Sequence, residues 1–140
     1  MTRLIVTSDR NGKSSVGVDR PIPSAPFASV PGFDPALIWG TAATPSVPWD
    51  GRNVADERKR LPGLAERFEP ESPGMHTTDT VDYGILMEGE ISLELDDGEI
   101  VALKPGDIVV QNGTRHAWRN GGSRPATLIF VLVGARRSNG

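Results

Sequence analysis

Residues 75–89 read Met-His-Thr-Thr-Asp-Thr-Val-Asp-Tyr-Gly-Ile-Leu-Met-Glu-Gly, and this stretch decides the fold. Between Asp82 and Met87, the side chains of Tyr83, Ile85 and Met87 alternate with those of residues 82, 84 and 86. A period of two is typical of a β-strand. Gly, Pro, Asn and Asp residues separate the later strand-like runs, which lie at 91–95, 100–103, 107–111, 115–119 and 126–133. Short strands with turns about every 8–12 residues predict an all-β sandwich or barrel.

The first half of the chain has a different character, because ten of the twelve prolines precede His76. Proline cannot donate to a strand ladder, so this half is expected to be irregular or to form short edge strands. The turn dipeptide Asn11-Gly12 predicts a hairpin between residues 3–7 and 14–19. Three further elements are predicted: a strand at 36–41, a helix capped by Asn53 at 53–60, and a strand at 64–69.

Composition narrows the class of protein. At 140 residues one domain is expected. A net charge of −3 and a pI near 5.3 argue against a nucleic-acid partner. The longest apolar run, 128–133, is too short to cross a bilayer, and residues 1–9 turn polar too soon for a secretory segment, so a cytoplasmic protein is expected. The basic pair Arg136-Arg137 is interpreted as a solvated tail.

His76 and His116 are the only histidines, and the chain has no cysteine. Imidazole combined with carboxylate is then the usual way to hold a transition metal, and this combination suits zinc, iron, nickel or manganese. The prediction depends on whether the two histidine segments face each other across one barrel.

The second histidine segment, residues 111–120, reads Gln-Asn-Gly-Thr-Arg-His-Ala-Trp-Arg-Asn. Together the two segments resemble the cupin superfamily, and specifically its small single-domain bacterial members. The first cupin motif, G-x5-H-x-H-x3,4-E-x6-G, is matched in register by His76, Thr78, Asp82 and Gly89. In the second motif, G-x5-P-x-G-x2-H-x3-N, glutamine replaces the proline and the other matches are Gly113, His116 and Asn120. The resemblance covers residues 64 to 134.

The resemblance implies a double-stranded β-helix, the jelly-roll barrel of cupins, over residues 64–140. Residues 1–63 would form an irregular, proline-rich extension whose short strands pack on the barrel or on a dimer partner. A divalent metal ion would bind His76, Asp82 and His116, since a threonine stands at the position of one family histidine. Asp79 competes with Asp82 as the carboxylate ligand, and spacing favours Asp82.

The expected function is that of a metal-dependent enzyme, a lyase or isomerase acting on an oxygenated organic acid or polyketide-like metabolite. Asp79 would then transfer a proton and Gln111 would hold a substrate oxygen or join as a fourth ligand. An iron-dependent dioxygenase, a non-catalytic small-ligand-binding module and a metal-free structural barrel are the alternatives. Trp118 is expected to line the pocket and Tyr83 to pack in the core. A homodimer is expected, with no nucleic acid or membrane partner.

Overall fold

The computed structural model describes residues 3–22, 26, 32–45, 47–48, 50–57 and 67–138, without the side chains of residues 56–57. The chain divides into two compact units, Met1–Gly63 and Leu64–Gly140.

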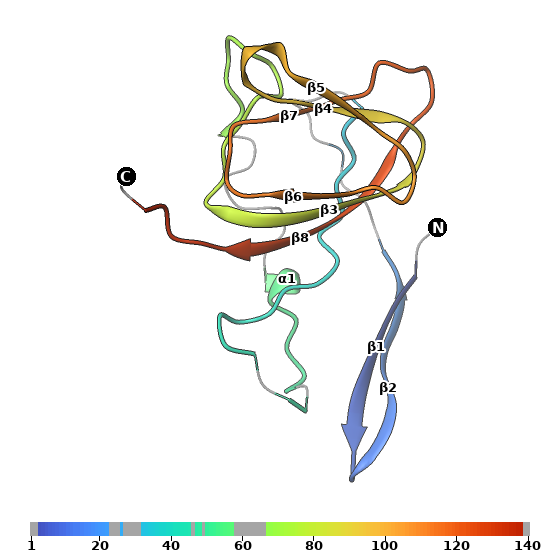
Figure 1. Cartoon of the computed structure of the whole chain (residues 1–140). Helices are drawn as coiled ribbons and strands as arrows, with labels where there is room; N and C mark the ends of the chain where they lie inside the picture. The colour runs from blue at the N-terminus through green and yellow to red at the C-terminus, as the bar shows by residue number, and fades with distance from the viewer. Residues whose placement is uncertain are drawn as a thin grey trace. The chain divides into compact units, whose positions relative to one another are not determined.

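The second unit consists of short antiparallel strands, as the alternating pattern predicts. The strands are β3 (Thr80–Glu88), β4 (Ile91–Glu94), β5 (Ile100–Leu103), β6 (Ile108–Gln111), β7 (Ala117–Arg119) and β8 (Thr127–Gly134), with a 3-10 turn, η2 (Asp96–Gly98), between β4 and β5. They form two three-stranded sheets, in the orders β6-β3-β8 and β5-β4-β7. Figure 1 shows these two sheets as facing layers. The expected all-β jelly-roll architecture is confirmed.

The register of β3 determines which side chains face the barrel interior. Successive side chains on a strand point to opposite faces, so Asp82, Gly84 and Leu86 are buried together. Asp82 lies opposite Gln111 on β6, which brings two polar side chains to one end of the inner face. Tyr83 points the other way and its residue is 44% exposed, so the prediction that it packs in the core is wrong.

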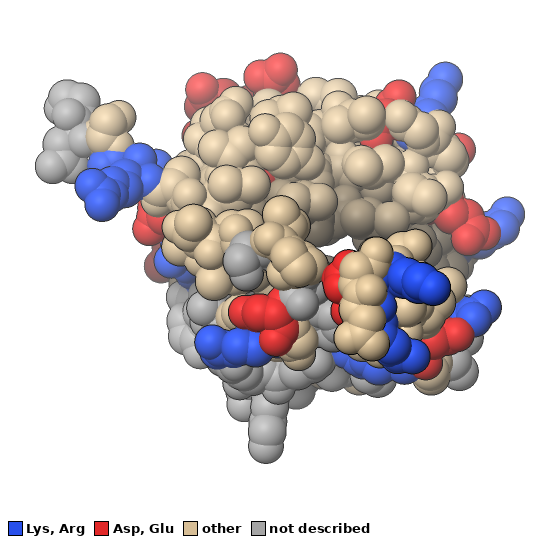
Figure 2. Space-filling view, turned by 90° about the horizontal axis from the view of Figure 1, so that it is seen from below, with Lys and Arg blue, Asp and Glu red and all other residues tan. Residues whose placement is uncertain are grey.

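The outer face of the β6-β3-β8 sheet is apolar. Paired residues on neighbouring strands share a face, and the pairing groups Val81, Tyr83, Ile85, Ile108, Val110, Ile129, Val131 and Val133 on this outer surface. Most of them are exposed, Val131 at 53%. Figure 2 views the molecule from the side of β8, and a broad area there shows neither basic nor acidic side chains.

In the first unit, β1 (Arg3–Arg10) pairs with β2 (Lys13–Pro21) across the turn at Asn11 and Gly12. The predicted hairpin is confirmed, although both strands run further than the sequence indicated. Arg3 forms an ion pair with Asp19 across the strands, and this guanidinium lowers the pKa of the Asp19 carboxyl.

The helix α1 (Val54–Glu57) begins directly after Asn53, whose Oδ1 accepts a hydrogen bond of 3.0 Å from the Ala55 amide. The predicted cap is therefore confirmed, while residues 58–60 lie outside the described part of the chain. No described helix is long and apolar enough to cross a membrane.

The strand predicted at 36–41 does not form. Its backbone turns to the helix start instead: the Gly40 amide donates to Oδ1 of Asn53 at 2.9 Å, and the Gly40 carbonyl accepts from the Val54 amide at 3.0 Å. These bonds replace those of a strand ladder. In the strand predicted at 64–69, residues 67–69 are not extended strand, and residues 64–66 are outside the described part.

Candidate functional site

The two histidines lie side by side inside the barrel. His76 and His116 form an isolated antiparallel bridge in which the amide of each donates to the carbonyl of the other at 3.0 Å. Their ring centroids are 4.3 Å apart, and both residues are buried. The two motif segments therefore face each other, which is the condition on which the metal-site prediction depends.

Each imidazole is held by a backbone carbonyl. Nδ1 of His76 lies 2.9 Å from the Gly74 oxygen, and Nδ1 of His116 lies 2.9 Å from the Thr114 oxygen. A carbonyl oxygen only accepts, so Nδ1 carries the hydrogen and the lone pair of the neutral ring is on Nε2. Metal-binding histidines commonly have this arrangement, because the second nitrogen fixes the tautomer and the ring orientation.

Burial lowers the pKa of His116, and the neighbouring His76 lowers it further. The hydrogen bond to the Thr114 carbonyl and the charge of Asp82 act in the opposite direction. The net effect favours the neutral ring, which is the form that binds a metal ion.

A buried polar cluster lies on the same inner face. It comprises His76, Thr78, Asp82, Gln111 and His116. Among the described residues, neither Oδ1 of Asp82 nor Nε2 of Gln111 has a hydrogen-bond partner. A buried polar atom without a partner costs about 1–3 kcal/mol, so the fold carries an unfavourable free-energy term here that a bound group could remove.

The donor atoms of this cluster fit a divalent metal ion in their chemistry. Two Nε2 lone pairs and the Asp82 carboxylate oxygen, which has no described hydrogen-bond partner, form a two-histidine, one-carboxylate set. In spacing the fit is incomplete, because no group of three His, Cys, Asp or Glu residues within the described ranges is close enough to hold an ion. The paired imidazoles are the formed part of the site, and Asp82 is the candidate third donor.

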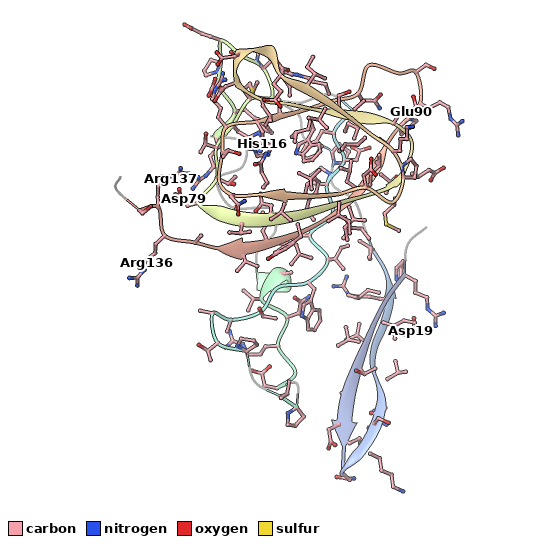
Figure 3. All side chains as sticks on the ribbon, viewed as in Figure 1. Asp19, Asp79, Glu90, His116, Arg136 and Arg137 are labelled. Carbon is pink, nitrogen blue, oxygen red and sulfur yellow. The ribbon has the colours of Figure 1, made fainter. Side chains whose placement is uncertain are left out.

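Asp79 does not join the cluster. Its side chain is 51% exposed and pairs with Arg137, with 3.0 Å between Oδ1 and Nε, and with Arg67 at 3.8 Å. Figure 3 shows Asp79 beside Arg137, while His116 lies inside the barrel. This placement supports Asp82 as the carboxylate of the cluster. Arg136 and Arg137 are both exposed, as the interpretation of the basic pair as a solvated tail expects, although Arg137 is also ion-paired with Asp79.

A row of aromatic rings flanks the histidines. Phe68 contacts His76 edge-on at 5.1 Å between centroids, Trp118 contacts His116 at 6.0 Å, and Phe130 contacts Trp118 at 5.3 Å. Trp118 therefore lies where the sequence predicted, next to the cluster. Phe68 and Phe130 were not predicted, because neither is a position of the two motifs and the ring contacts depend on the folded structure.

Gly84 makes room for the last ring of this row. A Cβ atom at this position would lie 2.8 Å from Cε1 of Phe130, closer than real Cβ atoms approach a neighbour. Glycine on β3 thus lets the Phe130 ring approach the strand closely.

Comparison with known proteins agrees with this geometry. The family model described as a cupin domain matches residues 65–132. The chain is 34% identical over 111 residues to the cupin-domain-containing oxidoreductase fogC of Aspergillus ruber, an alignment that covers 69% of this chain and 54% of that protein. It is 52% identical over 79 residues to the oryzines biosynthesis cluster protein J of Aspergillus oryzae, covering 53% and 44%. It is 46% identical over 63 residues to the phomopsin biosynthesis cluster protein D of Diaporthe leptostromiformis, covering 44% and 33%.

The chain spans about half or less of the length of these relatives. All three are fungal, so they do not support the bacterial part of the expected resemblance. The strand order, the facing histidine segments and the family match agree: residues 65–132 form a cupin domain, and this part of the chain belongs to the cupin superfamily.

Proposed function

We propose that the chain is a metal-dependent cupin enzyme that converts an oxygenated small organic molecule. The observation that carries this proposal is the buried cluster on the inner face, in which two oriented imidazoles accompany two polar atoms that have no hydrogen-bond partner within the described part of the chain. A barrel that served only as a scaffold would have no need of such atoms, because apolar side chains of the same size would avoid the cost of burying them.

His76 and His116 would hold the ion through their Nε2 atoms, and Asp82 would supply the third protein ligand. Zinc, iron, nickel and manganese all accept this donor set. Once bound, such an ion would polarise a carbonyl or carboxylate oxygen of the substrate or acidify a bound water.

Gln111 would position the substrate. Its Oε1 accepts a hydrogen bond from the Thr114 hydroxyl, which fixes the orientation of the amide and leaves Nε2 as a buried donor without a partner among the described residues. An amide does not titrate near neutral pH, so its role would be to hold a substrate oxygen and not to transfer a proton. Asp79, paired with two arginines at the surface, has no comparable access to the cluster.

The row of aromatic rings indicates which chemical group the rest of the substrate would carry. Trp118 and Phe130 continue from His116 along the inner face, so an oxygenated end of the ligand would lie at the polar cluster and an apolar or planar part against these rings. This division between a polar end and an apolar wall suits a polyketide-like metabolite. Two of the relatives belong, by name, to biosynthesis clusters.

For the type of reaction we favour oxidation with dioxygen over the lyase or isomerase chemistry expected from the sequence. The Aspergillus ruber relative is named an oxidoreductase, whereas no feature of the cluster is specific to a lyase. Iron is then the expected metal, since it both binds the two-histidine, one-carboxylate set and reacts with dioxygen.

Elemental analysis of the purified chain tests the metal site. We expect about one transition-metal ion per chain in the wild type and a loss of that ion in His116→Ala. Glu90→Gln, which changes an exposed carboxylate in the turn between β3 and β4, should keep the wild-type content. A metal-free wild type, or full metal content in His116→Ala, would contradict the proposal.

A second measurement separates the two reaction types. The iron-loaded chain is incubated with a panel of hydroxylated benzoic acids, with and without dioxygen, and products and oxygen uptake are measured. Oxidation predicts that turnover requires dioxygen and consumes it. Product formation under anaerobic conditions would favour the lyase or isomerase.

A further inference from the structure

We propose that Arg137 is a positioning residue, which clasps together the two loops that carry His76 and His116. The proposal rests on the proposed function, in which these two side chains hold a metal ion. Arg137 itself contacts neither imidazole in any described hydrogen bond, so it would act through the backbone of the loops.

The contacts of Arg137 join both histidine loops at one point. Its Nη2 donates to the carbonyl of Thr78 at 3.0 Å and to the carbonyl of Gly113 at 3.1 Å. Thr78 follows His76 by two residues, and Gly113 precedes His116 by three. A single nitrogen therefore bridges a segment that follows one candidate ligand and a segment that precedes the other.

Asp79 holds the guanidinium in this orientation. Nε of Arg137 donates to Oδ1 of Asp79 at 3.0 Å, and the Ala135 amide donates to the Asp79 carbonyl at 2.9 Å. The chain after β8 is thus bonded to the loop before β3 through both side chain and backbone. Figure 3 shows Arg137 turned toward Asp79 and Arg136 turned away from it.

The two loops are also packed closely where the guanidinium joins them. Gly113 has a φ of +65°, and a Cβ there would lie 2.9 Å from the Thr78 carbonyl oxygen. Only glycine allows this approach without strain, because the left-handed conformation and the contact both disfavour a side chain. Arg137 therefore bonds to the two loops at a place where their close packing already restricts their movement.

The chemistry of arginine suits this task better than that of lysine. The guanidinium is planar and always charged, and its fork of N–H groups reaches three acceptors on two segments at once. A lysine at the same place offers one nitrogen on a flexible stem. Metal affinity depends on holding ligands within about half an ångström of their working position, so losing the clasp should weaken binding.

The test compares Arg137→Gln with Arg136→Gln, a matched control in the same tail. Metal-free protein is titrated with Co²⁺ and binding is followed by visible absorption. We expect Arg137→Gln to lower Co²⁺ affinity by about 10- to 100-fold, the usual effect of removing a group that supports a metal ligand. Arg137→Lys should fall in between, and Arg136→Gln should match the wild type. Equal affinity in Arg137→Gln and Arg136→Gln would overturn the proposal.

Amide hydrogen exchange of the metal-free protein provides a readout that needs no ion. The amides of His76 and His116 donate to each other's carbonyls and should exchange at least about 10-fold faster in Arg137→Gln. The Leu95 amide, bonded to Glu99 at 2.8 Å in the β4–β5 turn, should be unchanged. Faster exchange at the His76, His116 and Leu95 amides alike would show general destabilisation and would overturn the proposal that Arg137 acts locally. A wild type that binds no Co²⁺ but shows the local exchange effect would refute the metal site and leave the clasp standing.

Discussion

Replacing Asp82 with asparagine should stabilise the metal-free chain while weakening its metal binding. The Asp82 carboxylate is buried, its Oδ1 has no partner among the described residues, and its Oδ2 receives only a long contact of 3.5 Å from the Thr78 hydroxyl. A buried polar atom without a partner costs about 1–3 kcal/mol, and more when it is charged. Asparagine keeps the size, removes the charge and adds a donor, so the free energy of unfolding should rise by about 1–3 kcal/mol.

The measurement is urea unfolding at pH 8 in the presence of a chelator, repeated with excess Co²⁺. Saturating metal should reverse or remove the difference, because a ligand at 100 times its Kd stabilises the folded state by about 2.7 kcal/mol and the wild type binds it more tightly. Asp79→Asn is the control. Its carboxylate is half exposed and paired with Arg137, so the metal-free variant should lose at most about 1 kcal/mol.

The two aspartates are thus expected to respond with opposite signs to the same chemical change. A metal-free Asp82→Asn variant less stable than the wild type would refute the reasoning, because it would mean that the buried carboxylate contributes to the fold without any bound group.

Three other predictions concern packing, pH and assembly. Gly84→Ala should lower the free energy of unfolding by about 1–3 kcal/mol, because its Cβ would press on Phe130. Gly134→Ala, whose Cβ would have no described atom within 4 Å, should change the free energy of unfolding by less than about 0.5 kcal/mol. Equal urea midpoints for the two variants would contradict this prediction. Burial lowers the pKa of His116, so the unfolded chain binds a proton more readily. The Tm of the chelated protein should therefore be highest above pH ~6.5 and fall as pH drops below that value, and a flat profile between pH 8 and 5 would contradict this. The chain should form a homodimer through the apolar outer face of its β6-β3-β8 sheet, and light scattering should give twice the 15.0 kDa chain mass. Val131→Lys places a charge on that face and should yield the monomer. A monomeric wild type would refute the dimer.

Alternation along the chain predicted the strands of the barrel well, because the pattern is local and the turns between strands carry their own residue types. It also predicted that Asp82 and Tyr83 point to opposite faces. Which of those faces is interior depends on the sheet that packs opposite, and that information is not local. The expectation for Tyr83 failed for this reason, although Asp82 was placed correctly on the face of the histidines.

The candidate site also has a part that the sequence could predict and a part that depends on contacts between remote segments. The resemblance to the cupin superfamily implied that His76 and His116 share one site, and the bridge between them is observed. The surroundings could not be predicted, because the residues that provide them come from remote parts of the chain. Arg137 is 58 residues from Asp79, and the aromatic row needs Phe130 from the last strand. The strand expected at 36–41 failed for a related reason, since the Asn53 cap, 13 residues from Gly40, takes up that glycine's amide.

The edge-on contact between Trp118 and His116 gives the site an optical reporter. Indole fluorescence is quenched by a nearby protonated imidazole, which accepts an electron from the excited ring. With 6.0 Å between these two ring centroids, the emission of Trp118 should change when His116 gains a proton or binds a metal ion. In a chain in which Trp39 and Trp49 are replaced by phenylalanine, Trp118 would therefore report on a bound metal ion in real time, without a label and before any substrate has been identified.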